Sequence, residues 1–469
     1  MVLSAPVGAS EALAYADAVW EDLLGDLALL VAVPSVVDMD DVRPGAPWGR
    51  ACREALDRAL FVAERLGLEV RDGGGHLGYA ELAGTSPSHV AGIAHVDVVP
   101  AGGGWLTDPF SLIRRGGMLV GRGVLDDKGA AIAMLYAAAF FVGRGLPGSV
   151  GIRCLLGASE EAGMQDVRWY RAHHEQPLFC FTPDASFPVC CGEKGGVNAE
   201  LSWPLEKDGR IVSISGGTAR NAVPDVAEAV VRVRSSELPP SPGVVVESAG
   251  ECLARVRAVG TGGHAAMPEG TVNAVGVLVN YLIGAVDFVA RERDYLALEY
   301  DILGVTDGSG VGIAAADDLF DPLTCVGTTI RTQGDRVVQD IDIRFPRSTS
   351  VERIQRGLDA SASSRGCSLN VVHAREPYFV DPSSPEVRAL LDAYAEVSGR
   401  PSRPFTIGGG TYAHHFDRAV AFGPLDPSDE LPAWAGPEHG ANEAIPEASL
   451  KRALATYVVA FDRLLRLGA

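Results

Sequence analysis

The sequence predicts an α/β fold. One discontinuous domain has a mixed, mostly parallel sheet with helices on both faces, and an α+β domain is inserted into it. The chain of 469 residues is too long for one ordinary hydrophobic core. In its first part, short β-rich runs alternate with helical runs, which is the order that gives a parallel sheet. The strands then become longer, before the first pattern returns. We therefore expect residues 1–192 and 378–469 to form the discontinuous domain, with residues 193–377 inserted.

The first segment is expected to supply most of the parallel sheet. Residues 9–32 are amphipathic, with Ser10 as the expected N-cap and Glu11 in the first turn. Residues 128–141 are rich in alanine and follow a loop flanked by glycines, which favours a buried helix. The other elements follow from β-rich runs and apolar periodicity: helices at 48–66 and from about 164, and strands at 78–82, 89–96, 151–156 and 179–181.

The inserted segment has a different pattern. Residues 227–233 and 336–344 predict long alternating strands, and residues 235–243 contain three prolines, which predicts a loop. One long helix is predicted at 272–290. After residue 377 the alternation returns, with a helix at 385–398, a strand at 420–422 and a final helix at 447–467.

Composition excludes some classes of partner. The formal net charge of -20 argues against nucleic acid, because a phosphate-binding protein needs a basic face. The longest apolar run, residues 130–142, is too short to cross a bilayer, so no membrane partner is expected. No basic residue precedes Arg43, so we expect no secretion signal and a cytoplasmic location. The eight cysteines contain no C-x-x-C pair and are interpreted as buried thiols.

Four short motifs carry candidate metal ligands at predicted strand ends or in nearby loops. They are His95–Pro100, Gly121–Gly129, Ser159–Glu161 and His439–Glu443. Asp184, after the strand at 179–181, adds another acid. Ligands of open α/β sheets bind beyond the carboxyl ends of the strands, and a pair of metal ions needs about this many histidine and carboxylate groups.

Each motif alone also has an ordinary structural interpretation. Asp126, Asp127 and Asp184 could be turn residues, and Glu160 and Glu161 could begin a helix. His439 could be an ordinary loop histidine. The ordered set is what favours a metal site. Two adjacent acids on a loop cannot both face one metal ion, so one of Glu160 and Glu161 is expected to bind metal and the other to transfer protons.

His264 is the one candidate histidine in the inserted segment. It follows Gly262 and Gly263 and precedes the predicted long helix. An imidazole presented by a glycine-rich approach suits a hydrogen-bond donor to a developing oxyanion. A structural loop histidine is an equally good interpretation from the residues alone.

Taken together, these motifs resemble the M20 family of metallopeptidases along nearly the whole chain. Within that family the chain is most similar to the dipeptidase V branch of bacterial aminoacyl-dipeptidases. The stretches that carry this narrower similarity are Gly78–Leu82, Thr182–Pro188 with Glu193–Gly195, Asn221–Asp225, Ile407–Ala413 and His439–Glu443. Where relatives carry an arginine after the Tyr412 motif, this chain has His414.

The resemblance implies a role for each candidate residue. It implies a catalytic domain of the zinc-exopeptidase type and an inserted lid domain. His95 and Asp184 would bind one metal ion, Glu161 and His439 a second, and Asp126 would bridge them. Glu160 would be the general base and acid, Asp97 would orient His95, and the Asp126–Asp127 peptide bond would be cis. His264 would polarise the scissile carbonyl, and substrate would be held by Asn221, Arg344 and the backbone of Gly409 and Gly410.

The implied activity is hydrolysis of short peptides, most of all dipeptides with free termini. It would use two divalent metal ions per chain, with Zn²⁺ expected and Mn²⁺ or Co²⁺ compatible with the ligands. The long insert implies a monomer that supplies its own lid histidine. Two alternatives stay open at this point: deacylation of N-acyl amino acids at the same metal site, and, more remotely, a metal-binding scaffold without catalysis.

Overall fold

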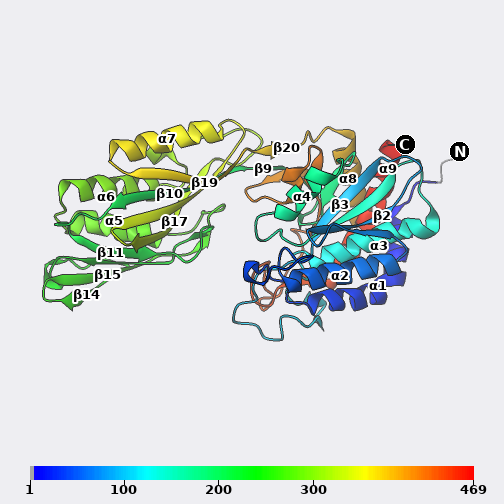
Figure 1. The fold of residues 1–469 in the computed structure, drawn as a ribbon, viewed down its shortest axis with the longest axis horizontal. Helices are drawn as coiled ribbons and strands as arrows, with labels where there is room; N and C mark the ends of the chain where they lie inside the picture. Colours follow the sequence, from blue (N-terminus) through cyan, green and yellow to red (C-terminus); the bar gives the residue numbers. More distant parts are fainter. Residues whose placement is uncertain (1–4, 469) are drawn as a thin grey trace. The chain divides into compact units, whose positions relative to one another are not determined.

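The computed structural model describes residues 5–468 as two compact units (Figure 1). The first unit comprises the residues up to Gly192, Phe379–Phe405 and the residues from Gly410 onward. The second comprises Glu193–Tyr378 and the short segment Thr406–Gly409. Residues 1–4 and 469, which the sequence assigned to the two ends of the discontinuous domain, lie outside the described residues.

The first unit is built on a mixed sheet. Its strand order is β1-β2-β6-β3-β7-β22-β9-β20, and β21 also pairs with β9. The central pairs β6–β3, β3–β7 and β7–β22 are parallel, whereas β1–β2 and β2–β6 are antiparallel. This mixed arrangement confirms the predicted fold class. The strands are β1 (Glu69–Asp72), β2 (Leu77–Leu82), β3 (His89–His95), β6 (Gly151–Gly157), β7 (Cys180–Thr182), β9 (Val189–Glu193), β20 (Tyr378–Phe379), β21 (Pro404–Ile407) and β22 (Ala419–Ala421).

The α-helices of the first unit pack around this sheet. They are α1 (Ala9–Val31), α2 (Arg50–Arg65), α3 (Lys128–Arg144), α4 (Gln165–His173), α8 (Pro385–Ser398) and α9 (Glu447–Leu467). Figure 1 shows α1, α2 and α3 side by side, in agreement with their mutual contacts. No helix among residues 5–468 is both long and apolar enough to span a bilayer.

The expected N-cap of the first helix is wrong. Gly8, not Ser10, is the N-cap of α1, and no side chain caps this helix. The Ala9 N–H instead donates to Oε1 of Glu396 on α8, at 2.8 Å. A side chain from a distant part of the chain, and not a local N-cap side chain, therefore accepts a hydrogen bond from the first turn of the helix.

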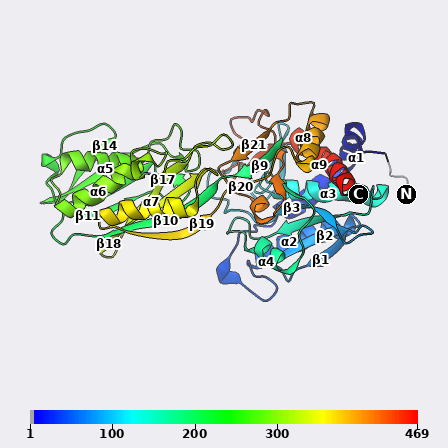
Figure 2. The ribbon, with the colours of Figure 1, turned by 90° about the horizontal axis from the view of Figure 1, so that it is seen from above.

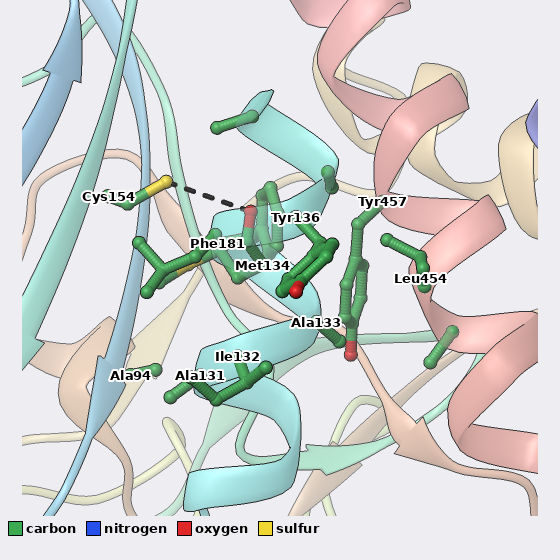
Figure 3. Close-up of a cluster of buried hydrophobic side chains, with 14 of the residues drawn as sticks. Ala94, Ala131, Ile132, Ala133, Met134, Tyr136, Cys154, Phe181, Leu454 and Tyr457 are labelled. Atoms are coloured by element: carbon green, nitrogen blue, oxygen red, sulfur yellow. Dashed lines mark hydrogen bonds between the residues drawn. The ribbon is translucent and has the colours of Figure 1, made fainter. Parts of the chain in front are cut away.

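The core of the first unit lies around α3. Figure 3 shows Met134 and Tyr136 of this helix between Cys154 and Phe181 of the sheet and Leu454 and Tyr457 of α9. These six side chains are at most 2% exposed. Six of the 17 residues of α3 are alanine, and the helix has no polar face, so it packs closely on both layers and is buried from Lys128 to Ala138. This packing fixes the loop before α3, which carries Asp126.

The second unit is an antiparallel sheet, seen from a second direction in Figure 2. Its order is β14-β15-β13-β11-β17-β18-β10-β19. Buried residues alternate with half-buried ones along β13 and mostly with exposed ones along β15, and α5 packs on one face of these strands. The elements are β10 (Gly195–Pro204), β11 (Ile211–Gly216), β13 (Val226–Val231), β14 (Val244–Gly250), β15 (Leu253–Val259), β17 (Thr324–Gln333), β18 (Arg336–Phe345), β19 (Ser368–Arg375), α5 (Ala274–Ala285), α6 (Ala290–Leu303) and α7 (Val351–Ser364).

The helix predicted at 272–290 is shorter in the structure. It is α5, Ala274–Ala285, and an irregular segment separates it from α6, which begins at Ala290. Asn273 caps α5, and its Oδ1 accepts a hydrogen bond from the Val275 N–H at 3.0 Å. The helix then ends at Ala285, and Val286 and Phe288 are buried in the core of the second unit. Burial of these two apolar side chains in an irregular segment outweighs the helical pattern of the flanking sequence.

Short strands outside the two large sheets position loops of the site. In the second unit β12 (Ala222–Val223) pairs with β16 (Gly263–His264). In the first unit β8 (Ala185–Ser186) pairs with β23 (Pro424–Leu425), and β4 (Ile113–Arg115), β5 (Met118–Val120) and β24 (Ala444–Pro446) form a small sheet. Residues 235–243 are irregular apart from the 3-10 turn Ser235–Glu237, in line with the predicted loop.

Candidate metal centre

Parallel strands bring the candidate ligands of the first unit to one edge of its sheet. His95 is the last residue of β3, Glu160 and Glu161 follow β6, and Asp184 follows β7. Because β3 is parallel to both neighbours, the carboxyl ends of these strands lie together. The loops before α3 and β24 add Asp126 and His439.

The six side chains form two groups with ligand-like spacing. His95, Glu160 and Asp184 form the first, and Asp126, Glu161 and His439 form the second. Within each group the nitrogen and oxygen atoms lie within 4.8 Å of one another. The first group is the deeper one, since His95 is fully buried whereas the His439 side chain is 50% exposed.

Asp126 lies between the two groups. Its Oδ1 is 2.9 Å from Nε2 of His95, and its Oδ2 is 2.9 Å from Nε2 of His439. One carboxylate therefore presents one oxygen to each histidine, which is the arrangement needed to bridge two cations. The Asp126–Asp127 peptide bond is cis, as the resemblance implies.

Burial and close contacts between the titratable groups change their pKa values. Burial, and then the neighbouring acids, raise the pKa of Glu160 and of Asp184 well above their usual values. Hydrogen bonds to Asp126 and Glu161 raise the pKa of His439 to about 11. Burial favours the neutral form of Asp126, but its hydrogen bonds with the two histidines outweigh this and lower its pKa.

The donor set fits divalent metal ions. Four carboxylates and two imidazoles converge, and the like charges repel unless protons or cations are bound between them. Imidazole and carboxylate donors suit Zn²⁺, Mn²⁺ or Co²⁺ better than Mg²⁺ or Ca²⁺, which prefer oxygen alone. The residues present therefore fit a pair of such ions.

Asp97 organises this site through both its backbone and its side chain. Its carbonyl lies 3.0 Å from Nδ1 of His95 and accepts a hydrogen bond if that nitrogen carries the proton. Its carboxylate accepts hydrogen bonds from the N–H groups of Glu160 and Glu161, at 3.2 and 3.0 Å. The sequence-based role of Asp97 considered His95 alone, whereas the side chain also holds the loop with the two glutamates.

Asp166 is a site residue that the sequence reasoning missed. Its Oδ2 accepts hydrogen bonds from the N–H groups of Ala158 and Ser159, at 2.7 and 2.8 Å, and from the Tyr412 hydroxyl at 2.5 Å. Asp166 is the second residue of α4 and is fully buried. An acid in the first turn of a helix is common, so the sequence gives no sign of this role. What distinguishes Asp166 is its hydrogen bond to Tyr412, a residue 246 positions away.

The second unit contains its own cavity. Its volume is about 240 Å³, and it is lined by Asn198, Arg220, Asn221, Asp342, Arg344, Val372 and His373. Two expected substrate-binding residues, Asn221 and Arg344, therefore share one cavity. Gly409 and Gly410 do not line it, and the Gly409 carbonyl accepts a hydrogen bond from Nη2 of Arg375 at 2.8 Å.

His264 lies beside Asn221 in the same unit. It pairs with Ala222 across β12 and β16, and the Ala265 N–H donates to the Asn221 carbonyl at 2.8 Å. The Ala266 N–H donates to Nδ1 of His264 at 3.1 Å. In the neutral ring, Nε2 then carries the proton, so the exposed His264 has the tautomer of a donor.

Comparison with known proteins gives a consistent result. The model of "Peptidase family M20/M25/M40" matches residues 92–463. "Putative dipeptidase YtjP" of Bacillus subtilis is 31% identical, over 95% of this chain and 97% of its own. "Putative dipeptidase SH1171" of Staphylococcus haemolyticus is 30% identical, over 94% and 97%.

Solved structures share the fold at much lower sequence identity. Human carnosine dipeptidase 1 matches with a TM-score of 0.56 and 17% identity, over 98% of this chain and 100% of its own. The dipeptidase Dug1p of Saccharomyces cerevisiae matches with a TM-score of 0.58 and 14% identity, over 98% of both chains.

Proposed function

The chain belongs to peptidase family M20/M25/M40, a metallopeptidase family, and on that premise we propose that it is a dinuclear-metal dipeptidase. Its reaction is hydrolysis of the peptide bond of dipeptides with free termini. The observation that carries the proposal is Asp126, which lies between two ligand groups with one oxygen toward each. The two full-length relatives named as dipeptidases support the substrate class.

In this proposal five residues hold the metal ions. His95 and Asp184 hold one, Glu161 and His439 hold the other, and Asp126 is shared. The ions are Zn²⁺, with Mn²⁺ or Co²⁺ as substitutes that the same donors accept. When bound, such a pair supplies an activated water and stabilises the negative charge that develops on the substrate carbonyl.

Glu160 is the residue that moves the proton. It adjoins Glu161 on one loop, yet the two carboxylates belong to different groups. Glu160 removes a proton from the attacking water and then delivers it to the leaving amine, so that one carboxylate acts as base and acid in turn. Asp97 keeps this loop in place through the two backbone N–H groups.

The second unit supplies most of the substrate contacts. Arg344 and Asn221 bind the free carboxylate from their shared cavity, since a guanidinium fork matches a carboxylate. His264 donates from Nε2 to the scissile carbonyl, and the Gly409–Gly410 backbone contacts the substrate main chain. The monomeric state and the cytoplasmic location expected from the sequence stay predictions.

The test is turnover by protein stripped with a chelator and reloaded with Zn²⁺, Mn²⁺ or Co²⁺. The substrates are free dipeptides, the same dipeptides N-acetylated, a tripeptide and N-acetyl amino acids. Metal-dependent cleavage of the free dipeptides alone is expected. Cleavage of the N-acetyl amino acids instead would replace the proposal with a deacylase at the same metal site.

The matched control for this test is Glu160→Gln. It keeps the volume of the side chain but removes the proton acceptor, so it is expected to bind both ions and lose turnover by about 10²–10⁴-fold. Full turnover in this variant would contradict the role of Glu160.

A further inference from the structure

We propose that Arg122 and Glu443 are a positioning pair on which one of the two metal sites depends much more than the other. Neither is a candidate ligand. Both belong to the motifs that carry candidate ligands, but the sequence predicted no role of its own for either residue. Nη1 of Arg122 lies 2.5 Å from Oε2 of Glu443, and their side chains are 1% and 0% exposed. The inference rests on the proposed function for the identity of the two sites.

Glu443 holds the loop that carries Asp126. Its Oε1 accepts hydrogen bonds from the N–H groups of Gly123, Leu125 and Asp126, at 2.9, 3.0 and 3.2 Å. Its backbone carbonyl accepts a fourth from the Gly121 N–H at 3.0 Å. The turn before α3 is therefore wrapped around one carboxylate, which sets the direction in which Asp126 leaves the backbone.

Arg122 holds the loop that carries His439. Its Nη2 donates to the His439 carbonyl at 3.2 Å, and its guanidinium lies over the Trp105 ring at 5.3 Å. His439 has φ of +60°, a left-handed conformation that is uncommon for a residue with a side chain. Such a conformation persists where its surroundings fix it, and the buried guanidinium supplies that contact.

These contacts are asymmetric with respect to the two ligand groups. Two of the three residues in the second group, Asp126 and His439, lie on the segments that this pair holds. The first group is held differently, because His95, Glu160 and Asp184 extend from the ends of β3, β6 and β7. Asp126 is shared, so loss of the pair would release one ligand of the first site, but it would release both Asp126 and His439 of the second. The second metal site should therefore weaken much more than the first.

The obvious way to break the pair is Glu443→Gln. The amide keeps the shape of the side chain, but it leaves the buried guanidinium without its counter-charge and places an N–H₂ group among donors. We expect one ion per chain to bind close to its wild-type affinity and the other to bind about 10–100-fold more weakly than in the wild type, which is typical of outer-shell substitutions. Raising the metal concentration should restore turnover.

The measurement is titration of metal-stripped protein with Zn²⁺ by calorimetry, with bound metal counted after gel filtration. The matched control is Glu81→Gln, which breaks an ion pair with Arg153 in the same unit, at 3.1 Å between β2 and β6. This control should bind both ions normally. Equal weakening of both sites in Glu443→Gln, or unchanged binding at both, would overturn the proposal.

A second variant covers the case in which Glu443→Gln does not fold. Arg122→Lys keeps the charge beside Glu443 but lacks the fork that reaches the His439 carbonyl. It is expected to weaken mainly the same site, and unchanged binding would count against the pair. A wild-type chain that binds two ions but cleaves no dipeptide would refute the proposed function and leave this inference standing. A wild-type chain that binds fewer than two would refute both.

Discussion

Arg344 donates two parallel hydrogen bonds to Asp342, from Nε to Oδ1 at 2.7 Å and from Nη2 to Oδ2 at 2.9 Å. The two residues lie two positions apart on β18, so they share a face of the sheet, and both line the 240 Å³ cavity of the second unit. Asn198 donates to the same carboxylate at 3.1 Å. The guanidinium is therefore held in a fixed plane, with Nη1 outside this pair of bonds.

The first prediction concerns this fixed fork. Arg344→Lys keeps the positive charge but removes the planar donors, so the KM for dipeptides with a free carboxylate should rise by roughly tenfold or more. Dipeptide amides, which lack that carboxylate, should be cleaved as by the wild type. Steady-state kinetics of the variant and the wild type, with free dipeptides and with dipeptide amides, measure this difference in KM.

The control for Arg344 is Arg336→Lys. Arg336 lies on the same strand, and its Nη2 donates to the Ser202 hydroxyl at 2.8 Å, outside the cavity. This substitution should leave both substrate series unaffected. If Arg344→Lys raises KM equally for free dipeptides and for dipeptide amides, Arg344 does not bind the substrate carboxylate.

The second prediction concerns the loop of the two glutamates. Asp166 and Asp97 together accept hydrogen bonds from four successive backbone N–H groups, residues 158–161. Oδ2 of Asp166 accepts hydrogen bonds from two N–H groups and the Tyr412 hydroxyl. In Asp166→Asn this position is taken either by an N–H₂ group, which cannot accept them, or by an uncharged amide oxygen, which accepts them more weakly. A small displacement of Glu160 should then lower kcat by about 10²-fold, with KM nearly unchanged.

Two comparisons separate this effect from a general loss of stability. Tyr412→Phe removes one of the three hydrogen bonds to Oδ2 of Asp166 and should lower kcat less than Asp166→Asn. Asp462→Asn removes another buried aspartate, bonded to the Val7 N–H and to Arg466. It should lower the melting temperature but leave kcat intact. A fall in kcat in all three variants would argue against a specific role of Asp166.

The parts of this molecule that the sequence predicted are those with local signals. The structure places α8 and α9 at the predicted bounds of 385–398 and 447–467. Pro385 stands at the first position of α8 and Gly399 follows its end, and both are strong boundary signals. The candidate ligands were found for a similar reason, because each follows a recognisable strand or lies in a glycine-flanked loop.

What the sequence could not show depends on contacts between distant residues. Asp166 and Tyr412 are 246 positions apart, and Arg122 and Glu443 are 321 apart. Nothing in the spacing of either pair indicates the contact. The break between α5 and α6 was missed because it follows from the burial of Val286 and Phe288 in a core that only the folded unit defines.

The third prediction concerns metal removal. Within each ligand group the carboxylate oxygens and the histidine nitrogen lie within 4.8 Å of one another, and without cations the repulsion between the carboxylates opposes folding. Each ion present at a hundredfold excess over its Kd should add about 2.7 kcal/mol to the stability of the first unit. Calorimetric melting with and without a chelator should show a lower melting temperature for the stripped protein.

The same experiment has a control for binding elsewhere. Asp126→Asn removes the shared carboxylate, so its melting temperature should respond much less to added Zn²⁺ than that of the wild type. A variant that gains as much stability from Zn²⁺ as the wild type would show that the ions bind at other groups.

The last prediction concerns pH and a buried acid that the proposed reaction does not use. Glu299 on α6 is fully buried, and neither carboxylate oxygen has a hydrogen-bond partner among residues 5–468. Burial raises the pKa of Glu299 from 4.5 to about 8. Between these values the folded chain keeps a proton that the unfolded chain has released. The free energy of unfolding should therefore fall with rising pH, by up to about 1.4 kcal/mol per pH unit from this group.

Glu299→Gln removes the titration and keeps the size of the side chain, so its stability should lose that slope and exceed the wild type above pH 8. Urea unfolding of the metal-saturated protein between pH 5 and 9 measures both slopes. Glu292 on the same helix is the matched control, because it is also buried but accepts N–H bonds from Arg210 and Ile211 at 2.9 and 2.8 Å. Glu292→Gln should destabilise the protein and leave the slope in place. If Glu299→Gln keeps the slope of the wild type, the acid responsible lies elsewhere.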